Sequence, residues 1–321
     1  MKILAVDDDP IILDLLAQFL SVVGHHVLVT APSAAAALET ISENGAEPFD
    51  CFLLDIQMPG MDGTALAQRI RQSRVHAFTP IVMLTALSEK RSIDRAFAAG
   101  ATDYITKPLD PVELATRIGV IEHLVLSRQT HVSSHTLKLA DAATVPDLSA
   151  PVPLEGISNA IDYAAMENYV AQLSRSSLFG SWVFAFTLRK PESYSDSLSV
   201  PDFKLLIQDV AQVISKGLAD HHFLMSYAGS GTYLCITRSG YHPDMIRLED
   251  QINRQLNRAR IMSHDGAELH PRISSGAAIR LVWKSGEQIP AALATAVSTA
   301  RTAATEYERL KTNFFQIGIS A

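Results

Sequence analysis

The sequence predicts an α/β protein of two domains. Over residues 1–126, short apolar runs rich in β-branched residues alternate with segments of helical periodicity, which indicates a parallel sheet covered by helices. From about residue 160 the pattern changes, and two strands follow one another directly, as in an α+β domain. A length of 321 residues and a hydrophobic content of 47% are sufficient for two buried cores.

The N-terminal domain is predicted to contain five strands, each followed by a helical segment. Ile11, Leu15, Phe19 and Val22 recur at helical spacing after the first strand, and Ile93 and Phe97 do so before the fifth. Five consecutive strand–helix units favour a parallel sheet with helices on both faces. The strands are expected at Ile3–Val6, Val27–Thr30, Cys51–Leu54, Ile81–Leu84 and Tyr104–Thr106.

The C-terminal domain is predicted to have the order β-α-β-β-α-β-α-β after an initial helix, which suggests a ferredoxin-like α+β fold. The sequence Ala-Gly-Ser-Gly-Thr between two apolar runs predicts a hairpin. Helices are expected at Tyr163–Leu173, around the apolar stripe from Phe203 to Leu218, at Met245–Ala259 and at Ile289–Leu310. Strands are expected at Trp182–Leu188, Phe223–Tyr227, Tyr233–Thr237, Arg272–Arg280 and Phe314–Ile317.

Residues 127–158 are predicted to link the domain of residues 1–126 to that of residues 159–321. Ser, Thr and His dominate the start of this segment, and three prolines follow, which is typical of a linker. The helix that begins near Pro111 can extend into the first residues of this linker.

Composition excludes several classes of protein. The net charge of −7 argues against a general binder of nucleic-acid backbones. Cys51 and Cys235 both lie in apolar segments and are interpreted as buried core thiols rather than a disulfide framework or zinc site. No apolar run is long enough to span a membrane, and the apolar start is too short for a signal peptide, so a cytoplasmic protein is expected.

Polar side chains stand at the carboxyl ends of the predicted parallel strands, where ligands bind in such sheets. Three clustered carboxylates repel one another unless a cation binds, and oxygen ligands suit Mg²⁺. A lysine and a threonine opposite them would hold a phosphoryl group, and Asp55, alone on the central strand, is the candidate nucleophile. The residues at these strand ends are Asp7 and Asp8, Asp55, Thr85 and Ala86, and Lys107.

Residues 1–126 resemble the receiver domain of two-component response regulators. The resemblance rests on four pieces in the usual order and spacing: Val6-Asp7-Asp8, Leu54-Asp55 through Asp62-Gly63, Leu84-Thr85-Ala86, and Tyr104-Ile105-Thr106-Lys107-Pro108. It implies a flavodoxin-like (βα)5 fold with strand order 2-1-3-4-5. It also implies a cis Lys107-Pro108 bond.

The same resemblance implies a role for each matching residue. Asp55 would accept a phosphoryl group from a histidine kinase or phosphotransfer protein. Mg²⁺ would be held by Asp7, Asp8, Asp55 and the backbone carbonyl of Gln57, while Thr85, Ala86 and Lys107 would bind the phosphoryl oxygens. Thr85 and Tyr104 would form the conformational switch, although Tyr104 can also be interpreted as a half-buried strand aromatic.

Residues of the C-terminal domain are similar in element order to a GGDEF domain, the diguanylate cyclase fold. The segments that carry this similarity are Val210–Ile214, Met225–Tyr233, Arg272–Ala278 and Ala292–Leu310. The chain departs from the GGDEF motif, because Ala228, Gly229, Ser230, Gly231 and Thr232 stand in its place. The aspartate of the first strand would fall near Thr187, and two-metal chemistry needs carboxylates. The turn itself is interpreted as a hairpin rather than a phosphate cradle.

These observations predict a signalling protein rather than an enzyme. Phosphorylation of Asp55 would act through a catalytically inactive GGDEF-like domain, by protein interaction or by formation of a homodimer. The alternative is a divergent nucleotide-binding or cyclase-type enzyme controlled by the receiver. The acidic balance and the lack of a recognisable helix-turn-helix argue against a DNA-binding regulator.

Overall fold

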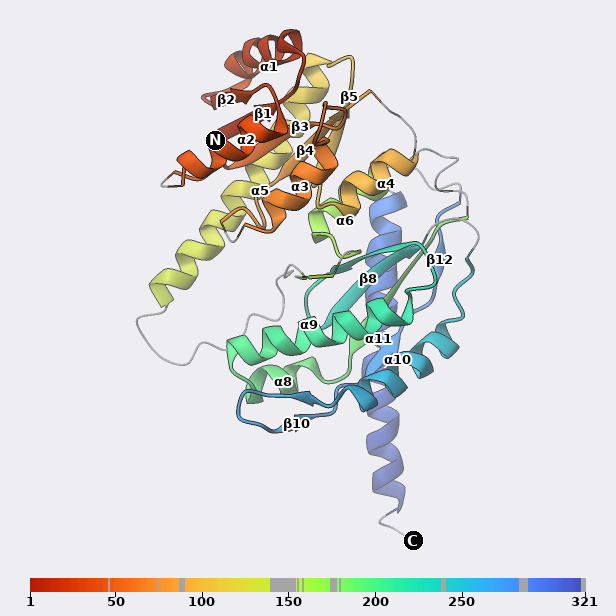
Figure 1. The fold of residues 1–321 in the computed structure, drawn as a ribbon. Helices are drawn as coiled ribbons and strands as arrows, with labels where there is room; N and C mark the ends of the chain where they lie inside the picture. The colour runs from red at the N-terminus through yellow and green to blue at the C-terminus, as the bar shows by residue number, and fades with distance from the viewer. Residues whose placement is uncertain are drawn as a thin grey trace. The chain divides into compact units, whose positions relative to one another are not determined.

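The computed structural model describes residues 1–318 except 46, 74, 87–89, 139–153, 155, 158, 174–177, 179, 238–240 and 283–287; the side chains of 23, 90–91, 127–138 and 312–318 are not described either. The chain divides into two compact units, residues 1–142 and 143–321 (Figure 1). Much of the segment expected to be a linker lies outside the described residues. Its first part is helical, because the helix that begins at Pro111 continues to Lys138.

The N-terminal unit contains a five-stranded parallel sheet in the order β2-β1-β3-β4-β5. The prediction of five parallel strands in a flavodoxin-like fold is therefore confirmed, and each observed strand differs from the expected range by one residue. β3 and β4 are buried along their whole length, as expected for central strands with helices on both faces. The strands are β1 (Lys2–Val6), β2 (Val27–Ala31), β3 (Cys51–Asp55), β4 (Ile81–Thr85) and β5 (Asp103–Thr106).

Helices cover both faces of this sheet (Figure 1). Alternate strand residues such as Ile3 and Leu53 form one buried cluster with Leu16 of α1 and Ile118 of α5. Asp9 and Asp62 begin α1 and α3 by accepting hydrogen bonds from backbone N–H groups of the first helical turn. The helices are α1 (Pro10–Val23), α2 (Ala34–Glu43), α3 (Gly63–Arg71), α4 (Lys90–Ala98) and α5 (Pro111–Lys138).

The C-terminal unit is built on an antiparallel sheet in the order β11-β6-β8-β7, with β12 also paired to β6. The expected hairpin joins β7 and β8. The strand expected at Arg272–Arg280 is wrong as a single element, because Gly276 interrupts it. A Cβ at Gly276 would lie 2.6 Å from a backbone nitrogen of the last long helix, so the chain bends where that helix comes closest. The strands are β6 (Trp182–Leu188), β7 (Phe223–Tyr227), β8 (Thr232–Thr237), β11 (Ile273–Ser275) and β12 (Ile279–Arg280).

The C-terminal sheet is also covered on both faces. A large apolar cluster joins Phe184 and Tyr233 to Val210 of α9 and Ile252 of α10. On the other face α6 and α11 contact the sheet (Figure 1). The helices are α6 (Tyr163–Gln172), α8 (Pro191–Ser197), α9 (Val200–Gly217), α10 (Met245–Ala259) and α11 (Gln288–Gly318).

The expectation of a closing strand at Phe314–Ile317 is wrong, because these residues belong to α11. No proline or glycine stands between Pro290 and Gly318, so nothing in the sequence ends the alanine-rich helix before that point. The β-propensity of Phe and Ile is overridden by the helix that precedes them. Two short elements were not expected: α8, and the hairpin of β9 (Ile261–Met262) and β10 (Glu268–Leu269).

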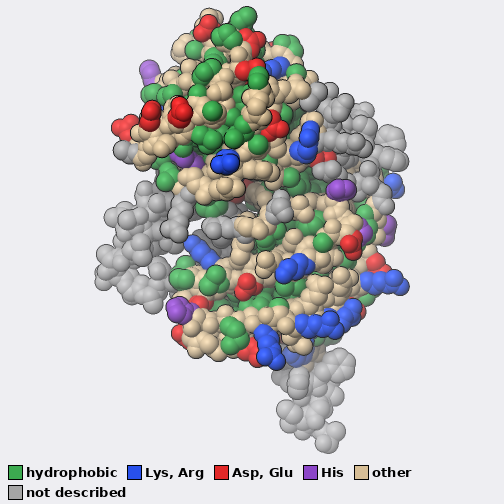
Figure 2. Space-filling view, viewed as in Figure 1, with side chains coloured by type: hydrophobic (Ala, Val, Ile, Leu, Met, Phe, Trp, Pro, Cys, Tyr) green, Lys and Arg blue, Asp and Glu red, His purple; other side chains and the backbone are tan. Residues whose placement is uncertain are grey.

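Basic side chains gather at the surface of the C-terminal unit, whereas both cysteines are buried, as the sequence predicts for the cysteines. Figure 2 shows basic side chains over α10, where Arg247, Arg254 and Arg258 are exposed. Cys51 and Cys235 are both free and fully buried. Of the helices that the structure describes, none combines the length and the apolar character needed to cross a membrane.

Candidate functional site

Three carboxylates meet at the carboxyl end of the N-terminal sheet. Asp7 and Asp8 follow β1 directly, and Asp55 is the last residue of the neighbouring strand β3. One oxygen from each carboxylate lies within 4.8 Å of the others. Asp7 and Asp55 are buried, whereas Asp8 is exposed. The parallel arrangement of β1 and β3 therefore brings together the three acids that the sequence predicts to cluster.

Lys107 lies between two of these acids. It follows β5, and its backbone N–H donates to the carbonyl of Thr85 at 2.7 Å. Its Nζ lies 2.6 Å from Oδ1 of Asp55 and 2.7 Å from Oδ2 of Asp7. The peptide bond between Lys107 and Pro108 is cis, as predicted. The ammonium group is thus directed at the acid cluster rather than at solvent.

The ion pair adjusts the pKa values of both partners. Burial raises the pKa of the Asp55 carboxyl, and Lys107 opposes this effect through a hydrogen bond and its charge. Burial alone would lower the pKa of Lys107, but its hydrogen bonds to Asp55 and Asp7 outweigh burial, and its pKa is raised. Lys107 therefore remains an ammonium at neutral pH and supports an ionised Asp55.

The other predicted residues lie along the same edge of the sheet. Thr85 is the last residue of β4 and is 1% exposed, and Ala86 follows it with its side chain exposed. Gln57 lies in the loop after β3 and is exposed. Tyr104 on β5 is 9% exposed, and its ring packs edge-on against Phe97 of α4 at a centroid distance of 6.3 Å. In this structure the ring of Tyr104 is therefore buried.

Gly63 supports the position of Asp55, and the sequence interpretation missed this role. It is the first residue of α3, and its N–H donates to the carbonyl of Ile56 at 3.1 Å. A Cβ at this position would overlap the backbone carbonyl oxygen of Asp55 and lie 2.9 Å from its carbonyl carbon. The Asp62-Gly63 pair reads as ordinary turn chemistry in the sequence, and only the fold reveals the close approach.

In the C-terminal unit, the turn at residues 228–232, where the sequence resemblance would place the GGDEF motif, is closed by its own hydrogen bonds. Gly229, Ser230 and Gly231 all have positive φ, and the hydroxyl oxygen of Tyr227 accepts a hydrogen bond from the N–H of Gly231 at 2.9 Å. Left-handed backbone is unusual for Ser230, which has φ 51°. The turn thus has the hairpin geometry that the sequence predicts. The N–H of Gly231 is already hydrogen-bonded to Tyr227.

Arg301 of α11 covers the same turn. It donates to the hydroxyl of Thr232 at 3.1 Å and to the carbonyls of Gly229 and Ala228 at 3.1 and 3.4 Å. Thr187 lies opposite on β6, with its hydroxyl 3.3 Å from that of Thr232. The oxygens of the turn are therefore directed at a guanidinium, which would repel a metal ion at this point.

Comparison with known proteins identifies the N-terminal unit. Residues 3–119 match the family described as "Response regulator receiver domain". The Bacillus subtilis transcriptional regulatory protein YvrH is 39% identical over 117 residues, which are 36% of this chain and 47% of that protein. Protein PetR of Rhodobacter capsulatus is 41% identical over 119 residues, which are 37% of this chain and 47% of that protein.

The alignments cover only part of each protein. The chain spans about half the length of these curated relatives, at 47% in both cases. A solved structure of a putative response regulator from Chloroflexus aurantiacus is 37% identical, covers 37% of this chain and 95% of that one, and has a TM-score of 0.35. The match to the receiver-domain family, together with the five-stranded parallel sheet, assigns residues 3–119 to the receiver domains of two-component response regulators.

Proposed function

We propose that this chain is a two-component response regulator that accepts a phosphoryl group on Asp55 and signals through a catalytically inactive GGDEF-like domain. The observation that carries the first half is the placement of Lys107, 2.6 Å from Asp55 and 2.7 Å from Asp7, beside a cluster of three acids. A nucleophilic carboxylate, a fixed cation and an acidic site for a metal ion are the parts that phosphoryl transfer requires.

The reaction is a transfer between a histidine and an aspartate. A carboxylate oxygen of Asp55 attacks the phosphorus of a phosphohistidine on a histidine kinase or phosphotransfer protein. The phosphorus–nitrogen bond breaks, its electron pair returns to the imidazole nitrogen, which takes up a proton, and Asp55 becomes an acyl phosphate. Lys107 exchanges its contact with the Asp55 carboxylate for one with a phosphoryl oxygen, and Thr85 and the backbone of Ala86 bind the remaining oxygens.

Magnesium fits the acid cluster. Three carboxylates whose oxygens lie within 4.8 Å of one another provide the hard oxygen donors that this ion prefers, and the exposed Asp8 leaves room for coordinated water. Asp7, Asp8, Asp55 and the backbone carbonyl of Gln57 would hold it. When bound, the ion neutralises charge on the phosphoryl group.

The conformational output is proposed to begin at Thr85. Movement of Thr85 toward the phosphoryl group would change the space beside Tyr104, whose ring packs on Phe97 of α4. The surface formed by α4, β5 and α5 would then differ between the two states. A sensor kinase or phosphotransfer protein is the proposed input partner, and the output acts by protein interaction or by dimerisation.

The C-terminal unit supports an output without catalysis. Its strand order β11-β6-β8-β7, with two helices on one face, is the arrangement expected of a ferredoxin-like, GGDEF-like domain. Residues 228–232 include no Asp or Glu, and position 187, where the first-strand aspartate would fall, is a threonine. Arg301 instead places a fixed positive charge beside Thr232. We therefore propose that it makes no cyclic dinucleotide. The transcriptional role in the name of YvrH is not carried over, because the alignment covers 36% of this chain.

Labelling with acetyl phosphate and Mg²⁺ tests the proposed phosphoacceptor. Wild-type protein should gain one acid-stable, base-labile phosphate per chain, and Asp55→Asn should gain none while keeping its circular dichroism spectrum. Lys107→Ala should uncouple phosphorylation from any change in the rest of the chain. Stoichiometric labelling of Asp55→Asn contradicts the assignment.

Two further measurements test the output. Incubation with GTP and Mg²⁺ or Mn²⁺ should yield no dinucleotide, and product formation would establish the alternative, a divergent cyclase. Affinity capture from native lysate with and without beryllofluoride should retain a partner in one state only. If neither state retains a partner, self-association becomes the output to measure.

A further inference from the structure

The last part of α11 lies beyond the sheet that the rest of the helix covers. At about 1.5 Å per residue, the helix from Gln288 to Gly318 is roughly twice as long as the strands beneath it. Ala296, Ala300 and Ala304 are buried, whereas the residues from 305 to 311 are exposed except for Glu308. Figure 1 shows the helix continuing past the C-terminal sheet. This end therefore has little of its own unit to pack against.

Apolar residues continue along this exposed end at alternating spacings of four and three. Tyr307 and Leu310 are 45% and 48% exposed, and Ala303 lies on the same side one turn earlier. The sequence places Phe314 and Ile317 at the next two positions of the repeat. A 4-3 repeat of this kind is the pattern of a coiled coil, with Tyr307 and Phe314 at a positions and the other three residues at d positions.

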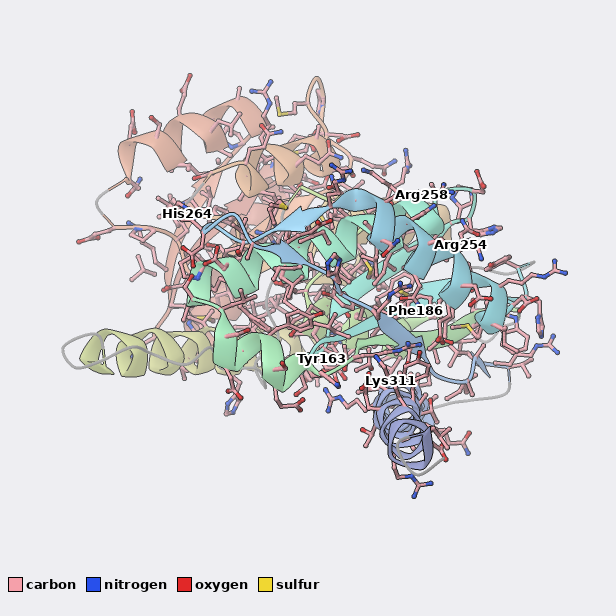
Figure 3. All side chains as sticks on the ribbon, turned by 90° about the horizontal axis from the view of Figure 1, so that it is seen from below. Tyr163, Phe186, Arg254, Arg258, His264 and Lys311 are labelled. Atoms are coloured by element: carbon pink, nitrogen blue, oxygen red, sulfur yellow. The ribbon has the colours of Figure 1, made fainter. Side chains whose placement is uncertain are left out.

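Charged residues flank this stripe in a way that selects the partner and its direction. Glu306 occupies a g position and Lys311 the following e position, and both are exposed. In a parallel pair of identical helices, each g residue faces the e residue five positions later on the other helix. The dimer would therefore contain two ion pairs, each between Glu306 of one copy and Lys311 of the other. An antiparallel pair would instead place like charges together. Figure 3 looks along α11 from its C-terminal end, with Lys311 labelled.

The existing contacts of these residues cover one face of Tyr307 and leave Leu310 exposed. Glu306 lies 3.8 Å from Arg309, an exposed pair one turn apart that contributes little. Arg189 covers one face of the Tyr307 ring, at 3.4 Å from the centroid, and Lys190 pairs with Glu308. These contacts fix the orientation of α11 on its own unit, while Leu310 remains exposed.

We propose that the stripe Ala303, Tyr307, Leu310, Phe314 and Ile317 of α11 joins two copies of this chain in a parallel coiled coil. This deepens the proposed output, since it names a second copy as a partner of the C-terminal unit. Only the signalling role of this coiled coil rests on the proposed function. The pairing itself is expected in both phosphorylation states.

Disulfide formation at single introduced cysteines tests the pairing and its direction. Both native cysteines are buried, so the introduced thiol is the accessible one. Leu310→Cys and Ala303→Cys should each form a disulfide-linked dimer under mild oxidation, because identical d positions of parallel helices lie close enough for a disulfide. An antiparallel pair centred on Leu310 would bring the two residues 310 together but would separate the two residues 303, so Ala303→Cys reports the direction. Arg309→Cys, about 100° around the helix from Leu310 and 71% exposed, is the matched control and should remain monomeric.

Sedimentation of the full chain provides the second measurement. Wild-type protein should self-associate, and Leu310→Glu should raise the dissociation constant by about tenfold or more, as expected from losing a buried leucine on each chain. Glu306→Lys should weaken the dimer, and the double variant Glu306→Lys/Lys311→Glu should restore it.

Three results overturn the proposal. They are a monomeric wild-type chain at all concentrations, equal cross-linking at 309 and 310, and cross-linking in a mixture of Ala303→Cys and Ile317→Cys without cross-linking within either variant alone, which indicates antiparallel helices. Each measurement is repeated on Asp55→Asn, which cannot be phosphorylated under the proposed function, so failure of the coiled coil and failure of phosphorylation are distinguishable.

Discussion

Replacing Gly63 by alanine tests how closely α3 is packed against the strand that carries Asp55. The added Cβ would overlap the backbone oxygen of Asp55, and backbone cannot move aside as a flexible side chain can. Overpacking of this kind costs about 1–3 kcal/mol. Gly119→Ala in α5 is the matched control, because nothing lies within 4 Å of its added Cβ. A helical Gly→Ala change of that kind stabilises by about 0.5–1 kcal/mol.

Urea unfolding followed by far-ultraviolet circular dichroism measures both variants. With a slope of about 1–3 kcal/mol per M, the midpoint for the N-terminal unit should fall by roughly 1 M in Gly63→Ala and rise slightly in Gly119→Ala. Both tryptophans, Trp182 and Trp283, belong to residues 143–321, so tryptophan emission reports the other unit and should not change. Gly63→Ala should also slow labelling by acetyl phosphate. Equal midpoints for the two variants would refute the argument from close packing.

Three further outcomes are expected. Arg301→Met removes hydrogen bonds to the hairpin turn and should lower the urea midpoint of tryptophan emission by an amount equivalent to about 1.5–3 kcal/mol, whereas Arg309→Met at an exposed site should not. Added MgCl2 should raise the midpoint of the N-terminal unit by mass action, and Asp8→Asn should abolish this rise; an equal rise in the variant places the metal elsewhere. Burial and the charge of Arg71 lower the pKa of His76 below 6.5 in the folded state, so the unfolded chain binds a proton that the folded chain does not. Stability should therefore fall as the pH drops below about 6.5, and by less in His76→Gln; urea midpoints at pH 7.5 and 5.5 check this.

The sequence was sufficient to predict the N-terminal sheet and the acids at its edge. Each strand is a short apolar run, and parallel strands that end in acids must place those acids at one edge. The contact of Lys107 with Asp55 and Asp7 follows from the same reasoning, although its distances of 2.6 and 2.7 Å required the structure. The chemical roles of Thr85 and Tyr104 stay predictions.

Features that depend on contacts distant in sequence could not be predicted. Arg301 lies 69 residues from Thr232, and no local pattern connects them. The break at Gly276 results from the approach of α11, so Arg272–Arg280 reads as one strand until that helix is placed. The prediction of a strand at Phe314–Ile317 was wrong because of a contact near in sequence, the helix that precedes these residues. Local β-propensity was considered there without the helix that continues through it.

Each unit of the chain contains one fully buried, free cysteine. Cys51 lies in β3 of the N-terminal sheet and Cys235 in β8 of the C-terminal sheet, both with 0% exposure. Burial raises the pKa of Cys51 to about 12 and that of Cys235 further, so neither forms a reactive thiolate in the folded protein. A thiol reagent can modify them only during transient opening. The two modification rates would therefore measure separately how often the centre of each sheet becomes accessible in the native protein.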